Sequence, residues 1–320
     1  MSERMIVSLD IGGTNSRGEV LTWNGDSYSE SLATATLPTP TGDGDAAVRT
    51  IVALIEQLLA NLSDSQRECV AAVGVGVPGL IDSEAGVVRL AANLGWRNRA
   101  LAAEVQQAVG YPVYVTHDVT AAGIAEQRLG AGHNSQDVMA VFLGTGIAAA
   151  FVSGGQLVRG GQIDDETRQP AGEIGHLPIV LDGLLCACGQ HGCFEMYASA
   201  RSFGRMYTEA LGIDVTSPEA KTSLDLVKAL DHDSIAREVW QKCTRYLAHG
   251  LIAASMPTGP SLIILGGGLA AAGDVLVDAV RAQFASMATV LTVPSIVTAQ
   301  LGQRAGTLGV ALLTIEWLND

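Results

Sequence analysis

Residues 4–23 read R-M-I-V-S-L-D-I-G-G-T-N-S-R-G-E-V-L-T-W, and this stretch decides the fold. Residues 5–12 form a short apolar run that ends in glycines, and a second strand-like run follows at 15–23. Short apolar runs separated by a glycine turn are typical of paired β-strands. The sequence therefore predicts a β-hairpin around I-G-G-T-N-S.

The same pattern returns in the middle of the chain. Residues 137–143 form an apolar run that ends in G-T-G, and residues 147–157 predict the return strand of a second hairpin. Two such half-repeats predict a duplicated α/β architecture with a cleft between the halves. Loops at strand ends that face a cleft are where α/β proteins bind ligands.

Periodicity and turn residues supply the other elements. The expected boundary between two domains falls near residue 119. Residues 1–119, joined by a C-terminal helix at 304–320, form one α/β domain, and residues 120–303 form the other, which carries a cysteine-rich loop. The remaining strands are expected at 27–37, 70–77, 113–116, 262–265 and 296–299, and the helices at 45–62, 100–109, 119–129, 235–256, 274–288 and 304–318.

Composition narrows the class of protein. The chain has 320 residues, of which 48% are hydrophobic, so it can bury a sizeable core. Its formal net charge of -14 repels phosphate backbones and argues against nucleic acid as a partner. No signal-peptide pattern opens the chain, and the apolar run at 140–152 is too short to cross a membrane. We expect a cytoplasmic enzyme with no membrane partner.

Three glycine-rich loops follow predicted strands. Glycines leave backbone N–H groups uncovered, so phosphate oxygens can approach them, and an adjacent carboxylate can hold hydrated Mg²⁺. The alternative for each loop is a plain turn, and the first is not a Walker A sequence. Three such loops at the ends of three strands in one chain weaken the plain-turn alternative. Their residues are Asp10, Gly12, Gly13 and Thr14, then Gly144, Thr145 and Gly146, then Gly266, Gly267 and Gly268.

Asp118 lies where a predicted buried strand gives way to a helix. A carboxylate there can serve as a general base at the floor of a cleft. It can equally cap the helix, because Asp is a preferred N-cap residue, and spacing alone favours the cap. His117 beside it can be a structural histidine whose ring nitrogens are satisfied by hydrogen bonds.

Cys186, Cys188 and Cys193 supply three thiolates within eight residues, and His176 or His191 can supply a fourth ligand. Three cysteines and one histidine make a closed structural zinc set. A redox site would need C-x-x-C near a thioredoxin-like pattern, which this sequence lacks. Spacing leaves the choice of histidine open.

Glu173 and Glu195 flank the cysteine cluster. Glutamates are most often solvated surface acids. A metal-bound fold would instead draw both carboxylates and His176 into one small region, and several fixed acceptors in one pocket suit a polyol.

Taken together, these motifs resemble the ROK family (repressors, open reading frames and kinases) of actin-like sugar kinases, over nearly the whole chain. The resemblance implies an actin-like (ribonuclease H-like) fold of duplicated α/β domains with a cleft between them. It rests on L-D-I-G-G-T-N-S-R at 9–17, G-V-G-V-P-G at 74–79, A-N-L-G-W at 92–96, H-D-V at 117–119, F-L-G-T-G-I at 142–147, G-E-I-G-H at 172–176, C-A-C-G-Q-H-G-C-F-E at 186–195 and L-G-G-G-L at 265–269.

The resemblance also implies a role for each candidate residue. Asp118 would be the general base for the sugar hydroxyl, and the three glycine loops would hold ATP, with Asp10 contacting its hydrated Mg²⁺. His176, rather than His191, would complete a structural zinc site with the three cysteines. The sugar site would comprise Gly79, Asn93, His117, Glu173, His176 and Glu195.

Two positions depart from the family pattern. The family more often has Asn where this chain has His117, so one contact to a sugar hydroxyl differs. After Gly146 the family continues with more glycine, whereas this chain continues with I-A-A-A at 147–150.

The activity implied is ATP-dependent phosphorylation of a hexose at its 6-hydroxyl, with glucose as the leading substrate. N-acetylmannosamine, N-acetylglucosamine and fructose are alternative acceptors, and polyphosphate is an alternative donor. The family implies a homodimer or homotetramer. A sugar-responsive transcriptional repressor would need a DNA-binding module before Asp10, which only nine residues precede, and the chain is acidic. A catalytically inactive sugar-binding module would not need to retain Asp118.

Overall fold

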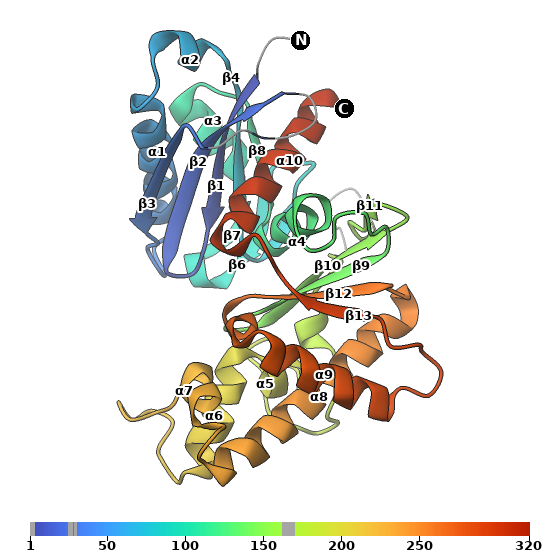
Figure 1. Cartoon of the computed structure of the whole chain (residues 1–320). Coiled ribbons are helices and arrows are strands. Elements are labelled where there is room, and N and C mark those ends of the chain that lie inside the picture. Colours follow the sequence, from blue (N-terminus) through green and yellow to red (C-terminus); the bar gives the residue numbers. More distant parts are fainter. Residues whose placement is uncertain (1–3, 25–27, 29–30, 162–169) are drawn as a thin grey trace. The chain divides into compact units, whose positions relative to one another are not determined.

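The computed structural model describes residues 4–24, 28, 31–161 and 170–320, which form two compact units, each with its own sheet and core (Figure 1). Unit 1 takes in Met1–Ala125 and Gly160–Pro170, and it returns at the end of the chain with Gln303–Asp320. Unit 2 takes in Glu126–Arg159 and Ala171–Gly302.

Unit 1 is built on a five-stranded sheet of order β3-β2-β1-β4-β8. The predicted hairpin is confirmed: β1 and β2 are antiparallel, with Asp10 opposite Arg17. β4 runs parallel to β1, and β8 runs parallel to β4. The strands are β1 (Arg4–Ile11), β2 (Asn15–Trp23), β3 (Ala33–Pro38), β4 (Val70–Val77) and β8 (Val113–His117).

Helices cover both faces of this sheet. Figure 1 shows α1 (Gly44–Ala60) and α3 (Leu101–Val109) on one face and α10 (Ala305–Asn319) on the other. Two strand glycines let α10 lie directly on β4, since a Cβ at Gly74 would come 2.2 Å from Thr314 Oγ1 and one at Gly76 would come 2.7 Å from Val310. The first and last parts of unit 1 therefore share one core.

The smaller elements of unit 1 complete it. A three-stranded antiparallel sheet follows β4, and the 3₁₀ turn within it carries Asn93. These elements are α2 (Asp64–Glu68), β5 (Leu80–Asp82), β6 (Val87–Ala91), η1 (Ala92–Leu94), β7 (Trp96–Arg99) and α4 (Asp118–Leu129), the last continuing into unit 2.

Unit 2 repeats the sheet of unit 1. Its strand order is β11-β10-β9-β12-β13, with β9 and β10 antiparallel and β12 and β13 parallel to their neighbours. Equal order and equal directions in the two sheets confirm the predicted duplicated α/β architecture. The strands are β9 (Val138–Leu143), β10 (Ile147–Ser153), β11 (Gln156–Leu157), β12 (Leu262–Gly266) and β13 (Ser295–Thr298).

A layer of helices packs on one face of this second sheet (Figure 1). Its longest member, α8, ends at Gly259 in the left-handed conformation, which glycine adopts without steric cost. The helical elements of unit 2 are η2 (Ile174–His176), α5 (Glu195–Ala198), α6 (Ala200–Ala210), α7 (Ser223–Ala229), α8 (Ser234–Thr258), η3 (Gly268–Ala272), α9 (Asp274–Met287) and η4 (Gly302–Arg304), which extends into unit 1.

Some sequence-based expectations were wrong in detail. The single strand expected at 147–157 is two strands, because Gly154 and Gly155 take φ values of 56° and 76° and turn the chain back. The strand expected at 27–37 begins only at Ala33, and residues 27, 29 and 30 lie outside the described residues. Within the described ranges, no helix is both long and apolar enough to cross a membrane.

Candidate active site

The first glycine turn presents open backbone. Gly13 and Thr14 are exposed, and a Cβ on Gly13 would meet nothing within 4 Å. The turn is closed by Gly12 N–H donating to Asn15 O at 3.1 Å, and Thr39 N–H donates to Thr14 O at 2.9 Å. The turn is thus fixed at its base, while its tip has room for phosphate oxygens.

Asp10 lies just before this turn, against the start of α10. A Cβ on Gly306 would come 2.4 Å from Asp10 Oδ2, so the helix backbone covers the carboxylate. Partial burial, the largest cause, and the charge of Asp118 together raise the pKa of Asp10 to about 7, although Arg17 lowers it. A partly buried carboxylate beside a second one favours a nearby cation. Arg17 was not singled out from the sequence, although the hairpin register places it opposite Asp10.

Asp118 is the first residue of α4, directly after β8. Its Oδ1 accepts the N–H of Val119 at 2.7 Å and lies 3.3 Å from His117 Nε2. The other ring nitrogen of His117 lies 3.3 Å from Thr120 Oγ1. Only Oδ1 of Asp118 is thus engaged among the described residues, and its side chain is 23% exposed. The carboxylate is oriented by one oxygen while the other is available for a substrate.

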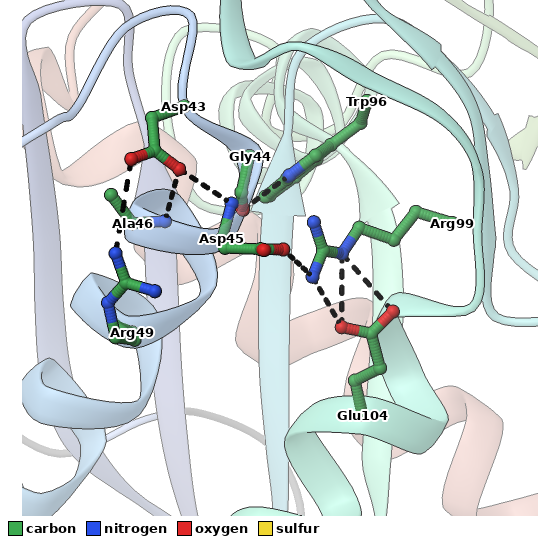
Figure 2. A network of polar contacts seen from close by, with 8 residues as sticks. All are labelled: Asp43, Gly44, Asp45, Ala46, Arg49, Trp96, Arg99 and Glu104. Atoms are coloured by element: carbon green, nitrogen blue, oxygen red, sulfur yellow. Dashed lines mark hydrogen bonds and ion pairs between the residues drawn. The ribbon is translucent and has the colours of Figure 1, made fainter.

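Asn93 is exposed on η1, and a polar network holds the segment around it (Figure 2). Trp96 is 2% exposed, and its Nε1 donates to Gly44 O at 2.8 Å. Arg99 bonds Asp45 at 2.8 Å and Glu104 at 2.7 Å. Gly42 N–H donates to Asn93 O, so the turn just before α1 positions this segment.

Gly79 closes β4 with a φ of 110°, and a Cβ there would lie 2.1 Å from Leu90 O. Only glycine fits this approach, so Gly79 has a backbone role that spacing did not reveal.

In unit 2, four donor atoms gather as a possible metal site: those of His176, Cys186, Cys188 and Cys193 all lie within 4.8 Å of one another. Cys186 Sγ is 3.8 Å from His176 Nδ1, and Cys188 Sγ is 3.6 Å from Cys193 Sγ. A tetrahedron with Zn–S bonds of about 2.3 Å has edges of about 3.8 Å, so this donor set fits zinc. His191 Nδ1 instead lies 2.8 Å from Gly183 O, which leaves His176 as the histidine of the group.

Two of the three thiols resist ionisation. Burial raises the pKa of the Cys186 thiol to about 12 and also raises the pKa of Cys193, whereas for Cys188 burial is outweighed by hydrogen bonds from the Gln190 N–H and the neighbouring thiols, which lower its pKa. A bound metal ion deprotonates such thiols outright, because its charge offsets that of the thiolates.

Glu195 begins α5 beside the cysteine group. Its Oε1 accepts from Cys186 Sγ at 3.2 Å and lies 4.0 Å from His176 Nδ1. Glu173 is half-buried, and its backbone carbonyl accepts the N–H of His176 at 3.1 Å, within η2. Unit 2 therefore brings the carboxylate of Glu195 beside the metal-ligand set, and the backbone of Glu173 bonds to that of His176.

The other two glycine turns also lie in unit 2. Gly144 N–H donates to Gly146 O at 3.1 Å, and Ala200 N–H donates to Gly144 O at 3.0 Å. Gly267 has a φ of 80°, and a Cβ built on it would lie 2.7 Å from the Leu143 backbone. A Cβ built on Gly268 would meet nothing within 4 Å. The two turns thus lie beside each other at the ends of β9 and β12.

Comparisons with known proteins agree with this fold. The ROK family model matches residues 6–316. The chain is 30% identical over 333 residues to the glucokinase of Halalkalibacterium halodurans, covering 100% of this chain and 98% of that one. It is 27% identical over 323 residues to the N-acetyl-D-glucosamine kinase of Vibrio vulnificus, covering 98% and 100%.

A solved structure shows the same fold. The ROK family glucokinase from Streptomyces griseus, in complex with glucose and AMPPNP, superposes with a TM-score of 0.80 at 30% identity, covering 97% of this chain and 98% of that one. The fold and these likenesses define an ATP-dependent sugar kinase of actin-like architecture. The chain belongs to the ROK family.

Proposed function

We propose that this protein transfers the γ-phosphoryl group of ATP to the 6-hydroxyl of glucose, giving glucose 6-phosphate. The observation that carries the chemistry is Asp118, which is fixed through Oδ1 and keeps Oδ2 available as a general base. Glucose is favoured over other hexoses by the glucokinase relative at 30% identity and by the glucokinase solved with glucose and AMPPNP.

In unit 1, Asp118 would accept the proton of the 6-hydroxyl as that oxygen attacks the γ-phosphorus. Phosphoryl transfer needs little covalent help from the protein, so positioning and charge compensation account for most of the catalysis. The backbone N–H groups of the turn at Gly12, Gly13 and Thr14 would contact phosphate oxygens. Mg²⁺ would offset phosphate charge, and Asp10 fits the role of holding its hydration shell, since its partly buried carboxylate is near enough to Asp118 for their charges to interact.

The glycine turns of unit 2 would also contact ATP. In this proposal Gly144, Thr145 and Gly146 lie at the phosphates, and Gly266, Gly267 and Gly268 line the nucleotide. The backbone at Gly144 and at Gly268 leaves room for a nucleotide, because a Cβ built at either position would meet nothing within 4 Å.

The sugar would be held by hydroxyl contacts. Asn93, Gly79 and His117 would contribute from unit 1, and Glu173, His176 and Glu195 from unit 2. His176 directs Nδ1 toward Cys186, which leaves Nε2 for a sugar hydroxyl. Zinc held by His176, Cys186, Cys188 and Cys193 would be structural, because four protein ligands leave no open position for chemistry.

A kinase for N-acetylglucosamine or N-acetylmannosamine is the second candidate, favoured by the 27% identity to the Vibrio vulnificus enzyme. Fructose as acceptor, polyphosphate as donor and a homodimeric or homotetrameric state remain predictions. The repressor alternative is disfavoured by the net charge of -14.

The proposal is tested by a sugar panel with ATP and Mg²⁺, scored by ADP release. We expect glucose to give the highest kcat/KM, and mass spectrometry should place the phosphate at the 6-position. A higher kcat/KM with N-acetylglucosamine or N-acetylmannosamine would transfer the assignment to the second candidate. If none of these sugars stimulated ADP release, the kinase proposal would be rejected. Replacing ATP with polyphosphate in the same assay tests the choice of phosphoryl donor.

A further inference from the structure

Glu195 connects the cysteine group to the second glycine turn. One carboxylate oxygen, Oε1, lies 3.2 Å from Cys186 Sγ. The other, Oε2, faces the turn: a Cβ built on Gly146 would lie 2.6 Å from it. Real Cβ atoms essentially never approach an oxygen so closely, so the carboxylate occupies the space that any side chain at residue 146 would need.

The same Oε2 also lies beside η2, since a Cβ at Gly175 would come 3.3 Å from it. The backbone of Glu195 is held by Ser202 Oγ, which donates to its carbonyl at 2.6 Å. The preceding residue, Phe194, is fully buried against Gly250. An extra methyl group at residue 146 would therefore displace the carboxylate itself.

We infer that Gly146 is a positioning residue for the sugar site: its missing side chain sets the place of the Glu195 carboxylate, although Gly146 belongs to a turn proposed for phosphate. This inference rests on the proposed function, in which Glu195 binds a sugar hydroxyl. It predicts that the turn at 144–146 affects both substrates, through Gly144 on the donor side and through Gly146 on the acceptor side.

The same turn supplies a matched control. A Cβ on Gly144 would meet nothing within 4 Å, so Gly144→Ala adds the same methyl group without touching Glu195. Neither glycine has a φ in the left-handed region, so alanine can adopt both backbone conformations. The two variants thus differ in what the added methyl group meets.

The experiment measures the Kd of the sugar by titration calorimetry without ATP, and the KM of each substrate, in both variants. We expect Gly146→Ala to raise the sugar Kd about tenfold, which corresponds to the loss of one hydrogen bond to a charged group. Gly144→Ala should leave the sugar Kd within about twofold and raise the KM for ATP. Zinc content by elemental analysis checks that both proteins are loaded and folded.

A second pair of variants keeps the test decisive if Gly146→Ala is poorly folded. Glu195→Asp shortens the side chain by one methylene and makes room for the methyl group. In that background, Gly146→Ala should cost much less sugar affinity than in the wild type, since the two residues share one contact. Equal sugar Kd values for the Gly144 and Gly146 variants, or additive effects in the double variant, would overturn the inference.

The outcome is separate from that of the proposed function. If the wild-type protein phosphorylates a sugar but the two glycine variants lose sugar affinity equally, the inference fails and the kinase assignment stands. If the wild-type protein phosphorylates none of the sugars tested, the kinase assignment fails first.

Discussion

At the scale of single residues, Asp118 combines two roles that the sequence presented as alternatives. Its Oδ1 bonds the start of α4, and its Oδ2 has no hydrogen bond to a described residue. Asp118→Asn preserves the shape and the first of these contacts but removes the base. We expect kcat to fall by about 10³-fold or more, with the sugar Kd changed less than about threefold.

Single-turnover phosphoryl transfer and calorimetric sugar binding, measured on the same preparation, check this prediction. Glu56→Gln, at an exposed position on α1, serves as the control for carboxylate-to-amide exchange. An Asp118→Asn enzyme with near wild-type kcat would remove Asp118 from the base role.

Asp10 predicts a pH dependence of stability. Its pKa is about 7 when folded and 3.8 by reference, because burial and the charge of Asp118 outweigh Arg17. The folded state then binds more protons than the unfolded state between about pH 4 and pH 7, so this group makes the protein less stable as pH rises across that window. The contribution is at most about 4 kcal/mol.

Asp10→Asn should therefore raise the melting temperature at pH 8 relative to wild type and have little effect at pH 4, in buffer free of divalent cations. Urea unfolding at both pH values measures the difference in the free energy of unfolding. A variant equally stabilised at both pH values would show that the packing of the amide, rather than the charge, is responsible.

At the scale of elements, Glu126 ties helix α4 to the segment after β13. Its side chain is 0% exposed, and its carboxylate accepts N–H groups from Ala131 at 3.1 Å, Gln300 at 3.0 Å and Leu301 at 2.7 Å. Glu126→Gln would turn an amide NH₂ toward these donors. We expect it to lower the free energy of unfolding by about 1–3 kcal/mol, measured by urea denaturation.

Exposed Glu56→Gln should change the same free energy by less than about 0.5 kcal/mol. Glu126→Gln and Glu56→Gln proteins of equal stability would show that the backbone N–H groups around Glu126 have other acceptors. The proposed structural role of Glu126 would then be wrong.

The long elements were predictable from the sequence, and the reasons are physical. β4 was predicted at 70–77 and α10 at 304–318, and the structure has them at Val70–Val77 and Ala305–Asn319. Both are buried, so their hydrophobic runs are long and clear. The β5, β6 and β7 strands have three to five residues each and mix polar with apolar side chains, so no period emerges.

The three cysteine ligands were predictable because they lie within eight positions of one another and thiolates restrict the choice of metal, whereas spacing left His176 and His191 as alternatives for the fourth ligand. The contact between Gly146 and Glu195 was not predictable, since it joins residues far apart in the sequence, and a glycine reveals neither the conformation nor the neighbour that requires it. The pKa of Asp10 likewise depends on burial under Gly306, which lies at the other end of the chain.

At the scale of the whole molecule, zinc should stabilise unit 2 and the sugar site together. Cys188→Ser removes an exposed ligand with little loss of packing. We expect the zinc content to fall from about one per chain to near zero, the sugar Kd to rise at least about tenfold, and the melting temperature to fall. Cys69→Ser, outside the ligand group, should keep its zinc.

Elemental analysis, calorimetry and thermal melting on the two serine variants make this comparison. A zinc-free Cys188→Ser protein with the sugar affinity of the wild type would separate the metal from the sugar site, and the structural coupling through His176 and Glu195 would then be wrong.

Helix α10 has a consequence for how the chain is made. Eleven of its residues, from Ala305 through Ile315, are buried, and the strand glycines Gly74 and Gly76 leave space that only this helix fills. The sheet of unit 1 is synthesised first, yet one of its faces has no cover until the ribosome has passed residue 315. Unit 2 is fully translated before that point, so the part of the protein that is begun first is finished last.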